Sequence, residues 1–362
     1  MTRRKTPFTL PDQRVDERDT MFARAARVSG TIPYEEYYES HPDLKNIDDK
    51  LRNHPPLLSP NTRYYDKKYS VGADKFFNDI ENIDLNQSQV DDLKKSLESD
   101  EESKKQRLKE AILKLGAVAV GFTDVPDEFV YSHHGRRDDH FGEEINNQHH
   151  TTIVFLVEMN HSRMQRAPYA EVINESAKQY YRAARIAKTL EAALVESRYE
   201  ATSNFDANYE LILPPMAVKA GLGEVGRNNI LIADKYGSRV RIGAVTTNLE
   251  INSDEPISLG VEEFCKICKK CSENCPSHSL SNDDKISIRN VRKWPTHVES
   301  CYGYWRTIGT DCGICMAICP FSHKNNWFHN SIRFLLRYFP FFHKIALFFD
   351  DLIYGRRWKT TP

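Results

Sequence analysis

Apolar residues recur at the spacings of helices and strands through the middle of the chain. Three stretches place them at every third or fourth position, which predicts helices: 88–97, 108–115 and 170–195. Four stretches are apolar or alternate with polar residues, which predicts strands: 117–122, 151–157, 210–213 and 239–247. The stretch 151–157 is apolar on both faces and should lie at the centre of a sheet. Helices mixed with strands in this way predict an α/β core.

The long predicted helix carries a tyrosine within its apolar stripe. Tyr180 lies between two alanines of that stripe, and Tyr181 borders it. Core packing, with the phenol bound to a backbone group, would explain Tyr180 without any chemistry. The stretch 239–247 begins with Arg239 and Arg241, which share one face and need a carboxylate, a phosphate or solvent as partner. They are candidates for an anionic ligand or a charged reaction centre, unless this strand is an exposed edge.

Three glycines follow the short strand predicted at 210–213. Gly221, Gly223 and Gly226 permit positive φ angles and a close approach of the backbone to a bulky ligand. Their spacing also matches the G-x-G-x-x-G fingerprint of dinucleotide-binding folds. That fingerprint directly follows a strand and opens a helix, whereas here two prolines intervene and no amphipathic helix follows. The pattern therefore favours a ligand other than a nicotinamide cofactor.

Both ends of the chain differ from this central part. Residues 1–85 are polar, broken by prolines and dense in tyrosine, which predicts an arm that wraps a core. Residues 124–150 form a loop rich in histidine and arginine, which could hold a metal, form a ligand rim or lie in solvent. Residues 328–354 are strongly aromatic but interrupted by basic residues, which predicts a cover over the core. A surface for a partner or a membrane face is the alternative for this last segment.

Composition narrows the function classes. The chain has 362 residues, a formal net charge of -1 and 28% charged residues, so a nucleic-acid binder is not expected. A mean hydropathy of -0.60 and the lack of a long apolar run argue against a transmembrane helix. Arg3 and Arg4 form a twin-arginine pair, but charged residues follow where an export signal needs an apolar stretch. We expect a cytoplasmic protein, or one at the periplasmic face of a membrane if a longer precursor was trimmed.

All eight cysteines lie between residues 265 and 319, in two runs. The runs read Cys-x2-Cys-x2-Cys-x3-Cys-Pro and, after an isolated Cys, Cys-x2-Cys-x3-Cys-Pro. A four-iron cluster takes four thiolates, and the last Cys of such a run ligates the other cluster. The spacing therefore predicts two 4Fe-4S clusters, one on Cys265, Cys268, Cys271 and Cys319, the other on Cys275, Cys301, Cys312 and Cys315. Structural zinc has no use for the third close Cys of the first run, and disulfides belong to oxidising compartments.

Several short segments stand in a fixed order around these runs. They are Val130-Tyr131-Ser132-His133, Val157-Glu158-Met159, Ala220–Arg227, Thr246-Thr247, Cys301–Trp305, Asp311–Met316, Cys319–His323 and Asp350–Gly355. In this order, and with the frame of eight cysteines, they resemble the corrinoid-dependent reductive dehalogenases over residues 15–355.

The resemblance implies the α/β (α+β) fold class, with cobalamin in a nitroreductase-like core and an appended ferredoxin-like module that holds both clusters. The implied organisation is an N-terminal wrapping arm at 1–100, a cobalamin-binding core at 101–258, a cluster module at 259–325 and an aromatic cover segment at 326–362. In that family the clusters pass single electrons to cobalt, which reduces a carbon–halogen bond so that hydrogen replaces the halide. The protein supplies positioning, a dry pocket and a proton.

Carried over to this sequence, the resemblance implies Tyr180 as the proton donor, with Tyr181 as the neighbouring choice. The basic residue that lowers the pKa of the phenol would be Arg241, or Arg239 on the same face. The implied corrinoid contacts are Gly221, Leu222, Gly223, Glu224, Arg227, Asn228, Ser322 and His323. The implied partners are an organohalide substrate and a reduced ferredoxin- or flavodoxin-type electron donor. A second copy of the chain and a membrane surface or membrane-anchor protein are further partners that this resemblance leaves open.

Two other functions remain open. Epoxyqueuosine reductase shares cobalamin and the cluster runs, and it resembles this chain around Gly221-Leu222-Gly223 but differs at Glu224–Arg227. Its catalytic Asp would correspond to Asp206, which stands in a different context here. A two-cluster electron carrier would need no pocket and no N-terminal part of this length. Such a carrier would contain iron but no cobalt, whereas the two enzymes would differ in their substrates.

Overall fold

A four-stranded antiparallel sheet forms the centre of the computed structural model, which describes residues 10–98 and 100–360. Its strands, in spatial order, are β1 (Ala119–Asp124), β2 (Thr151–Glu158), β6 (Val240–Thr247) and β3 (Ala201–Asn204). β2 lies between two strands and is buried along all but its last residue, as its two-sided apolar pattern predicts. The register sets Val157 of β2 opposite Arg241 of β6. The side chain of Arg241 therefore shares a sheet face with that of Val157.

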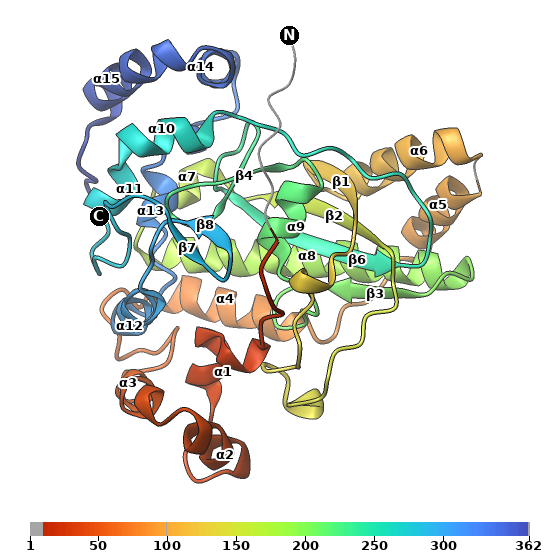
Figure 1. Cartoon of the computed structure of the whole chain (residues 1–362), viewed down its shortest axis with the longest axis horizontal. Helices are drawn as coiled ribbons and strands as arrows, with labels where there is room; N and C mark the ends of the chain where they lie inside the picture. Colours follow the sequence, from red (N-terminus) through yellow and green to blue (C-terminus); the bar gives the residue numbers. More distant parts are fainter. Residues whose placement is uncertain (1–9, 99, 361–362) are drawn as a thin grey trace.

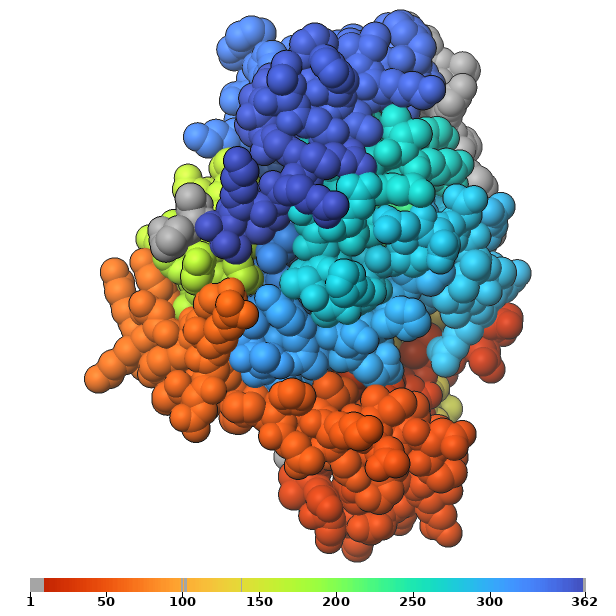
Figure 2. All heavy atoms as spheres, turned by 90° about the vertical axis from the view of Figure 1, so that its left-hand side faces the viewer, coloured from red at the N-terminus to blue at the C-terminus, as the bar shows by residue number. Residues whose placement is uncertain are grey.

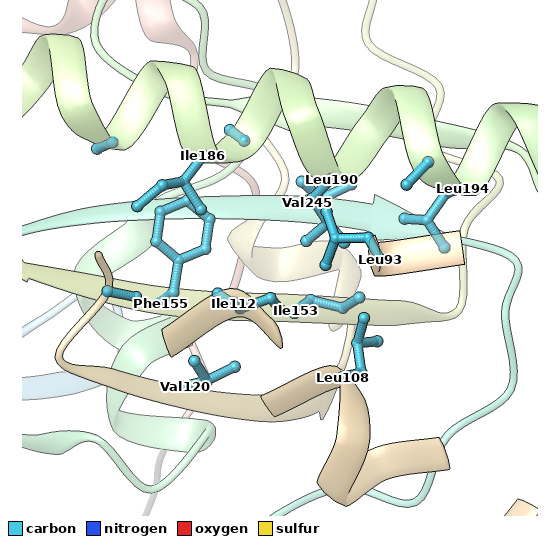
Figure 3. Close-up of a cluster of buried hydrophobic side chains, with 14 of the residues drawn as sticks. Leu93, Leu108, Ile112, Val120, Ile153, Phe155, Ile186, Leu190, Leu194 and Val245 are labelled. Atoms are coloured by element: carbon cyan, nitrogen blue, oxygen red, sulfur yellow. The ribbon is translucent and has the colours of Figure 1, made fainter. Parts of the chain in front are cut away.

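One face of the sheet is covered by α8 (Ala170–Glu196) and by helices that pack around it (Figure 1). These helices are α4 (Lys67–Asp79), α5 (Gln87–Leu97) and α6 (Glu101–Lys114). Figure 3 shows the resulting core, in which Ile186 of α8 lies above Phe155 of β2 and Leu190 lies farther along the helix, near Val245 of β6. Each such fully buried side chain contributes about 2 kcal/mol to folding. The helices predicted at 88–97, 108–115 and 170–195 correspond to α5, α6 and α8.

The opposite face of the sheet is covered by α9 (Leu213–Lys219) and a small hairpin. The hairpin consists of β4 (Gly223–Val225) and β5 (Leu231–Ala233). The strand predicted at 210–213 is wrong, because Leu211 makes only an isolated bridge to Val130 and α9 begins at Leu213. Two prolines stand in the first turn of α9. Proline lacks the N–H group that would be unpaired at a helix start, so these residues favour the helix over a strand.

The N-terminal segment, predicted as a wrapping arm, is largely helical where it is described. It contains η1 (Glu17–Asp19), α1 (Met21–Ala26), α2 (Ile32–Ser40) and α3 (Pro42–Arg52), followed by α4 and α5. Tyr34, Tyr37 and Tyr38 pack into a small cluster of their own. The twin-arginine pair, Arg3 and Arg4, lies outside the described residues. The loop after β1 carries two short turns of helix, η2 (Asp127–Phe129) and η3 (Asp138–His140), and α7 (His161–Met164) follows β2.

The cysteine runs lie on short helices beside the sheet, and two longer helices follow them. The cysteine region contains α10 (Val261–Cys268), α11 (Lys270–Glu273), β7 (Ile286–Ile288), β8 (Val291–Lys293), α12 (Val298–Ile308), α13 (Ile314–Ala317) and η4 (Pro320–Ser322). The chain then forms α14 (Trp327–Tyr338), η5 (Pro340–Phe342) and α15 (His343–Tyr354). In Figure 2 the C-terminal helices form one end of the molecule and the first helices form the other, with the cysteine region between them. Within the described part of the chain, no helix is both long and apolar enough to cross a bilayer.

Candidate functional site

Four of the eight cysteines line one cavity. Cys265 and Cys268 lie on α10, Cys271 lies on α11, and Cys319 directly precedes η4. The backbone reverses at Lys269, which has a φ angle of 55° and separates α10 from α11. This turn brings Cys271 back to the cavity that the two cysteines of α10 already face. The structure thus brings together the four residues that the spacing assigns to the first cluster.

The other four cysteines, Cys275, Cys301, Cys312 and Cys315, lie close enough to affect one another's ionisation. Burial and, to a smaller extent, the nearby Cys275 together raise the pKa of the Cys301 thiol to about 12. Burial also raises the pKa of Cys312 to about 12, to which Cys301 and Cys275 contribute. The pKa of Cys315 is raised by burial and then by the other three thiols. The residues predicted for the second cluster are therefore neighbours as well.

The first cavity fits a polynuclear cluster better than a single ion. Nη2 of Arg227 and Nδ2 of Asn228 are buried without a hydrogen-bond partner, and both residues line the cavity. Unused donors of this kind suit the sulfur atoms of an anionic iron–sulfur cluster. Among the described residues, no three His, Cys, Asp or Glu side chains converge on one metal position. Four thiols around a shared cavity match the wider frame of a four-iron cluster.

The glycine-rich segment makes close contacts within the chain itself. Gly221 has a φ angle of +74°, and a Cβ there would lie 2.6 Å from the carbonyl oxygen of Glu255. The Glu224 carboxylate accepts hydrogen bonds from the backbone N–H groups of Leu259 and Val261, where the chain enters α10. This segment therefore fixes the helix that carries two of the cysteines. The remaining predicted contacts in it, Leu222 and Gly223, are buried in the fold.

Arg239 fastens the end of the second cysteine run to the sheet. Its guanidinium is fully buried, and Nε donates to the carbonyl oxygen of Ser322 at 2.6 Å. Nη1 donates to Glu158 Oε1 at 2.9 Å and to the Met159 carbonyl at 2.7 Å, and Nη2 donates to the His323 carbonyl at 3.3 Å. All three nitrogens therefore have partners near the Cys319 run. The structure places Ser322 and His323 together, but it engages Arg239 with them and not with Tyr180.

Tyr180 of α8 and Arg241 of β6 are in contact. The guanidinium carbon of Arg241 lies 4.5 Å from the centroid of the Tyr180 ring. Its Nη2 donates to Ser176 Oγ at 2.7 Å and to Asp311 Oδ2 at 3.2 Å, and the Ser176 hydroxyl donates to the same carboxylate oxygen. Arg241 Nε and Asp311 Oδ1 are buried without hydrogen-bond partners. An ion pair with one unused donor and one unused acceptor is suited to receiving a polar ligand.

The electrostatics of this centre keep Tyr180 protonated. Burial raises the pKa of the Tyr180 phenol, Arg241 lowers it in part, and Asp206 and Asp311 raise it again. Arg241 lowers the pKa of the phenol as expected, but burial outweighs the cation, so the net shift is upward. Tyr181 points elsewhere and its ring packs against α4. Of the two predicted donors, only Tyr180 faces Arg241.

Sequence reasoning missed a second group of polar side chains beside this centre. Nη1 of Arg136 lies 3.3 Å from Asp206 Oδ1, and the Tyr209 hydroxyl lies 3.5 Å from the same oxygen. Arg136 and Asp206 both contribute to the electrostatic environment of Tyr180. Arg136 comes from the loop rich in histidine and arginine, for which the sequence left a metal site, a ligand rim and a solvated loop open. No motif links that loop to Asp206, so their contact could be seen only in the folded chain.

A large polar pocket opens near the end of β2 and the first turns of α8. Its cavity volume is about 780 Å³, within the roughly 300–1,000 Å³ of ordinary small-molecule sites. Its lining includes Glu158, the ion-pair partner of Arg239, and also Lys178 and Arg182 of α8. The ring nitrogen Nδ1 of His161 also belongs to a lining residue and is buried without a partner. The polar lining suits the amide and phosphate groups of a cofactor such as a corrinoid, part of which a cavity of this volume would hold.

Comparison with known proteins identifies the relatives of this arrangement. The chain is 32% identical over 212 residues to a tetrachloroethene reductive dehalogenase of Desulfitobacterium hafniense, which covers 56% of this chain and 38% of that protein. It is 37% identical over 153 residues to the tetrachloroethene reductive dehalogenase of Sulfurospirillum multivorans, covering 40% of this chain and 30% of that protein. The chain is a homologue of the reductive dehalogenases. It spans well under half the length of these relatives.

The fold agrees with this relationship. A solved reductive dehalogenase, whose structure suggests a mechanism for B12-dependent dehalogenation, superposes with a TM-score of 0.72 and 23% identity. The superposition covers 98% of this chain and 49% of that one, so the mixed α/β fold is confirmed as that of the reductive dehalogenases. An epoxyqueuosine reductase of Lactococcus garvieae is 32% identical over 120 residues, covering 32% of this chain and 33% of that protein. No protein-family model matches the chain.

Proposed function

We propose that this protein is a cobalamin-dependent reductive dehalogenase. The proposed reaction replaces the halogen of an organohalide by hydrogen: two electrons and one proton enter, and one halide ion leaves. The observation that carries the proposal is the position of Asp311, which binds Arg241 beside Tyr180 and directly precedes Cys312. An acid–base centre thereby adjoins the thiols of one predicted cluster, as a reaction that needs electrons and a proton together would require.

The residues that would hold the cofactors follow from the arrangement of the site. The two sets of four cysteines would hold the 4Fe-4S clusters, in a ferredoxin-like module appended to a nitroreductase-like core. The polar pocket near β2 would hold part of the corrinoid, with Ser322 and His323 near its inner end. When bound, the corrinoid would supply the metal that reduces the carbon–halogen bond, and the clusters would supply single electrons. Gly221, Leu222, Gly223, Glu224, Arg227 and Asn228 remain predicted contacts of the corrinoid.

Tyr180 is the proposed proton donor. Its phenol is half-buried on α8, and burial keeps it protonated until the substrate carbon needs a proton. Arg241 then stabilises the phenolate that remains, because its charge lies over the ring. Asp311 and Ser176 hold the guanidinium in that place through Nη2. A positioned side chain of this kind typically accelerates proton transfer by about 10²–10⁴-fold.

The proposal is tested with protein purified under anoxic conditions and loaded with iron, sulfide and cobalamin. We expect halide release from an organohalide when a reduced viologen supplies electrons. Tyr180→Phe should abolish turnover while the iron and cobalt contents stay unchanged, and Tyr181→Phe is the matched control that should retain it. Turnover retained in Tyr180→Phe would remove Tyr180 from the role of donor. Iron without any retained cobalamin would instead support a simple electron carrier.

One observation favours an epoxyqueuosine reductase as the second candidate. Asp206, the position considered for the catalytic Asp of that enzyme, lies in the centre with Arg136 and Tyr209. The same loaded protein should therefore be offered an epoxyqueuosine-containing tRNA stem-loop. Conversion of that RNA without halide release from any organohalide would replace the first proposal. The physiological electron donor and the location in the cell stay predictions from the resemblance.

A further inference from the structure

The last helix of the chain is amphipathic in the reverse of the usual sense. In a helix packed on a globular protein, the apolar stripe faces the core and the polar side faces water. On α15 the apolar residues at helical spacing are exposed instead, and we call them the outer stripe: Ile345, Phe348, Phe349, Leu352 and Ile353. Phe348 is 63% exposed and Leu352 is 70% exposed. This side of the helix lacks a covering layer among the described residues.

Polar contacts hold the inner side of α15 against the protein. Asp350 accepts from Lys270 Nζ at 2.5 Å and pairs with His323 Nε2 at 2.6 Å. Nε2 of His343 lies 2.8 Å from the carbonyl oxygen of Leu336. Because these groups turn the polar side inward, the outer stripe is a fixed feature of the fold. The predicted cover over the core is therefore true only of the inner side, where Leu336 and Ala346 are buried.

The exposed apolar surface extends from the outer stripe onto α14 and η5. Half of the large hydrophobic side chains that are exposed in the described chain lie between residues 327 and 354. Those outside the outer stripe are Trp327, Phe328, Phe334, Phe341 and Tyr354. Together with the outer stripe they form what we call the C-terminal apolar surface. In Figure 1 the two helices stand apart from the central sheet, at one end of the molecule.

Basic residues outnumber acidic residues in the segment that carries the C-terminal apolar surface. Residues 324–360 contain seven Lys and Arg but two acidic residues, although the whole chain carries a net charge of -1. Both acidic residues are occupied, since Asp350 binds Lys270 and Asp351 pairs with Arg356 at 3.2 Å. Lys344 and Arg357 are exposed. The outward field of this end is therefore positive.

We propose that the C-terminal apolar surface binds an anionic lipid surface. Aromatic and aliphatic side chains ringed by Lys and Arg are typical of helices that lie in the headgroup region of a membrane. α15 has 12 residues and is about 18 Å long, too short to span a hydrocarbon core of about 30 Å. It would therefore lie along the surface and not cross it. A second copy of the chain is the alternative occupant, which the experiment below distinguishes from a lipid surface.

The experiment is flotation of the purified full chain with lipid vesicles. We expect binding to vesicles of phosphatidylcholine with about one-quarter phosphatidylglycerol, and several-fold weaker binding to phosphatidylcholine alone. Phe348→Ser/Leu352→Ser should weaken binding about 100-fold, because each buried side chain is worth about tenfold. Lys344→Glu/Arg357→Glu should remove the preference for anionic vesicles. The matched control is Val71→Ser/Val195→Ser, which changes exposed apolar residues on α4 and α8 and should bind as the wild type does.

Folding and oligomeric state are measured on the same samples. Iron content and circular dichroism show whether each variant is folded, and light scattering gives its mass. A folded wild type that does not float would overturn the proposal. So would a dimer that disappears in Phe348→Ser/Leu352→Ser without any vesicle binding, which would assign this surface to a second copy. Equal loss of flotation in the control pair would likewise reject it. None of these results depends on dehalogenation, so the proposed function is tested separately.

Discussion

Replacing Arg241 by methionine removes the cation above Tyr180 but keeps a long, flexible side chain. The guanidinium carbon lies 4.5 Å from the centroid of the ring. A unit charge at that distance stabilises a phenolate by about 3.7 kcal/mol at an effective dielectric constant of about 20. Asp311 accepts a hydrogen bond from the same guanidinium at 3.2 Å, and its negative charge cancels part of this stabilisation. We therefore assign about half of the stabilisation energy to Arg241. A barrier higher by about 2 kcal/mol corresponds to roughly thirtyfold slower proton transfer.

The substitution should also change the ionisation of its two neighbours. Arg241 lowers the pKa of Tyr180 more than Arg136 does, so that pKa should rise further without it. The pKa of Asp311 is already raised by burial, and loss of Arg241 should raise it again until the carboxyl takes up a proton. Arg241→Lys keeps the positive charge but loses the planar fork, so its turnover should be intermediate.

The assay is anoxic halide release per bound cobalt, with a reduced viologen as electron donor and iron content measured in parallel. Slower proton transfer should also increase the solvent isotope effect on turnover, which a purely structural defect would leave unchanged. Arg185→Met is the matched control, because it removes a half-buried arginine from the same helix as Tyr180. If Arg241→Met keeps its cofactors and turns over within about threefold of the wild type, the electrostatic role assigned to Arg241 is refuted.

Three further predictions concern pH, stability and redox potential. Burial raises the pKa of Tyr180 above its usual value of about 10, so the proposed donor stays protonated at neutral pH. As the pH is raised, turnover should therefore stay constant up to about pH 9. A loss of turnover centred near pH 8 that moves with Arg241→Lys would contradict this. Asp350→Asn should destabilise the protein by about 3 kcal/mol, because Lys270 is 1% exposed and would keep only its longer ion pair with Asp351 at 3.3 Å. Lys270→Met/Asp350→Leu should recover most of that loss in thermal denaturation, and equal losses in both variants would argue against it. Asn228→Ala should lower the reduction potential of the cluster on Cys265, Cys268, Cys271 and Cys319 by on the order of 50 mV, since it removes a buried donor. Potentiometry followed by electron paramagnetic resonance measures this change, and the second cluster is the internal reference.

Local sequence patterns were sufficient to predict an element where one periodicity dominated the segment. The two-sided apolar run of β2, the stripe of α8 and the spacing of the cysteines each specify a structure through nearest neighbours in the sequence. For the same reason Tyr180 could be placed on the buried side of a helix before any fold was known. The strand expected before α9 failed because the first-turn preference of proline outweighed a short apolar run.

The sequence did not predict which residues far apart in the chain would be partners. Asp311 stands 70 residues from Arg241, and nothing in its surroundings distinguishes it from an ordinary residue of a cysteine loop. Glu224 looked like part of a ligand-binding glycine loop, but its carboxylate instead binds the backbone at the start of α10. The outward direction of the α15 stripe depends on Lys270, a buried partner far away in the chain. In each case a polar group found its partner only through tertiary packing.

The two arginines at the start of β6 explain how one segment can serve both electron and proton delivery. Arg241 holds Asp311 at the beginning of the segment 311–323, and Arg239 binds the carbonyl oxygens of Ser322 and His323 at its end. Three of the eight cysteines lie between these points and belong to both predicted clusters. Because the arginines stand two residues apart, one strand end fixes both ends of the segment. A shift of β6 would therefore move the cysteines of both predicted clusters and the partner of Tyr180 together, which would keep the proposed electron path and the proposed proton donor in register.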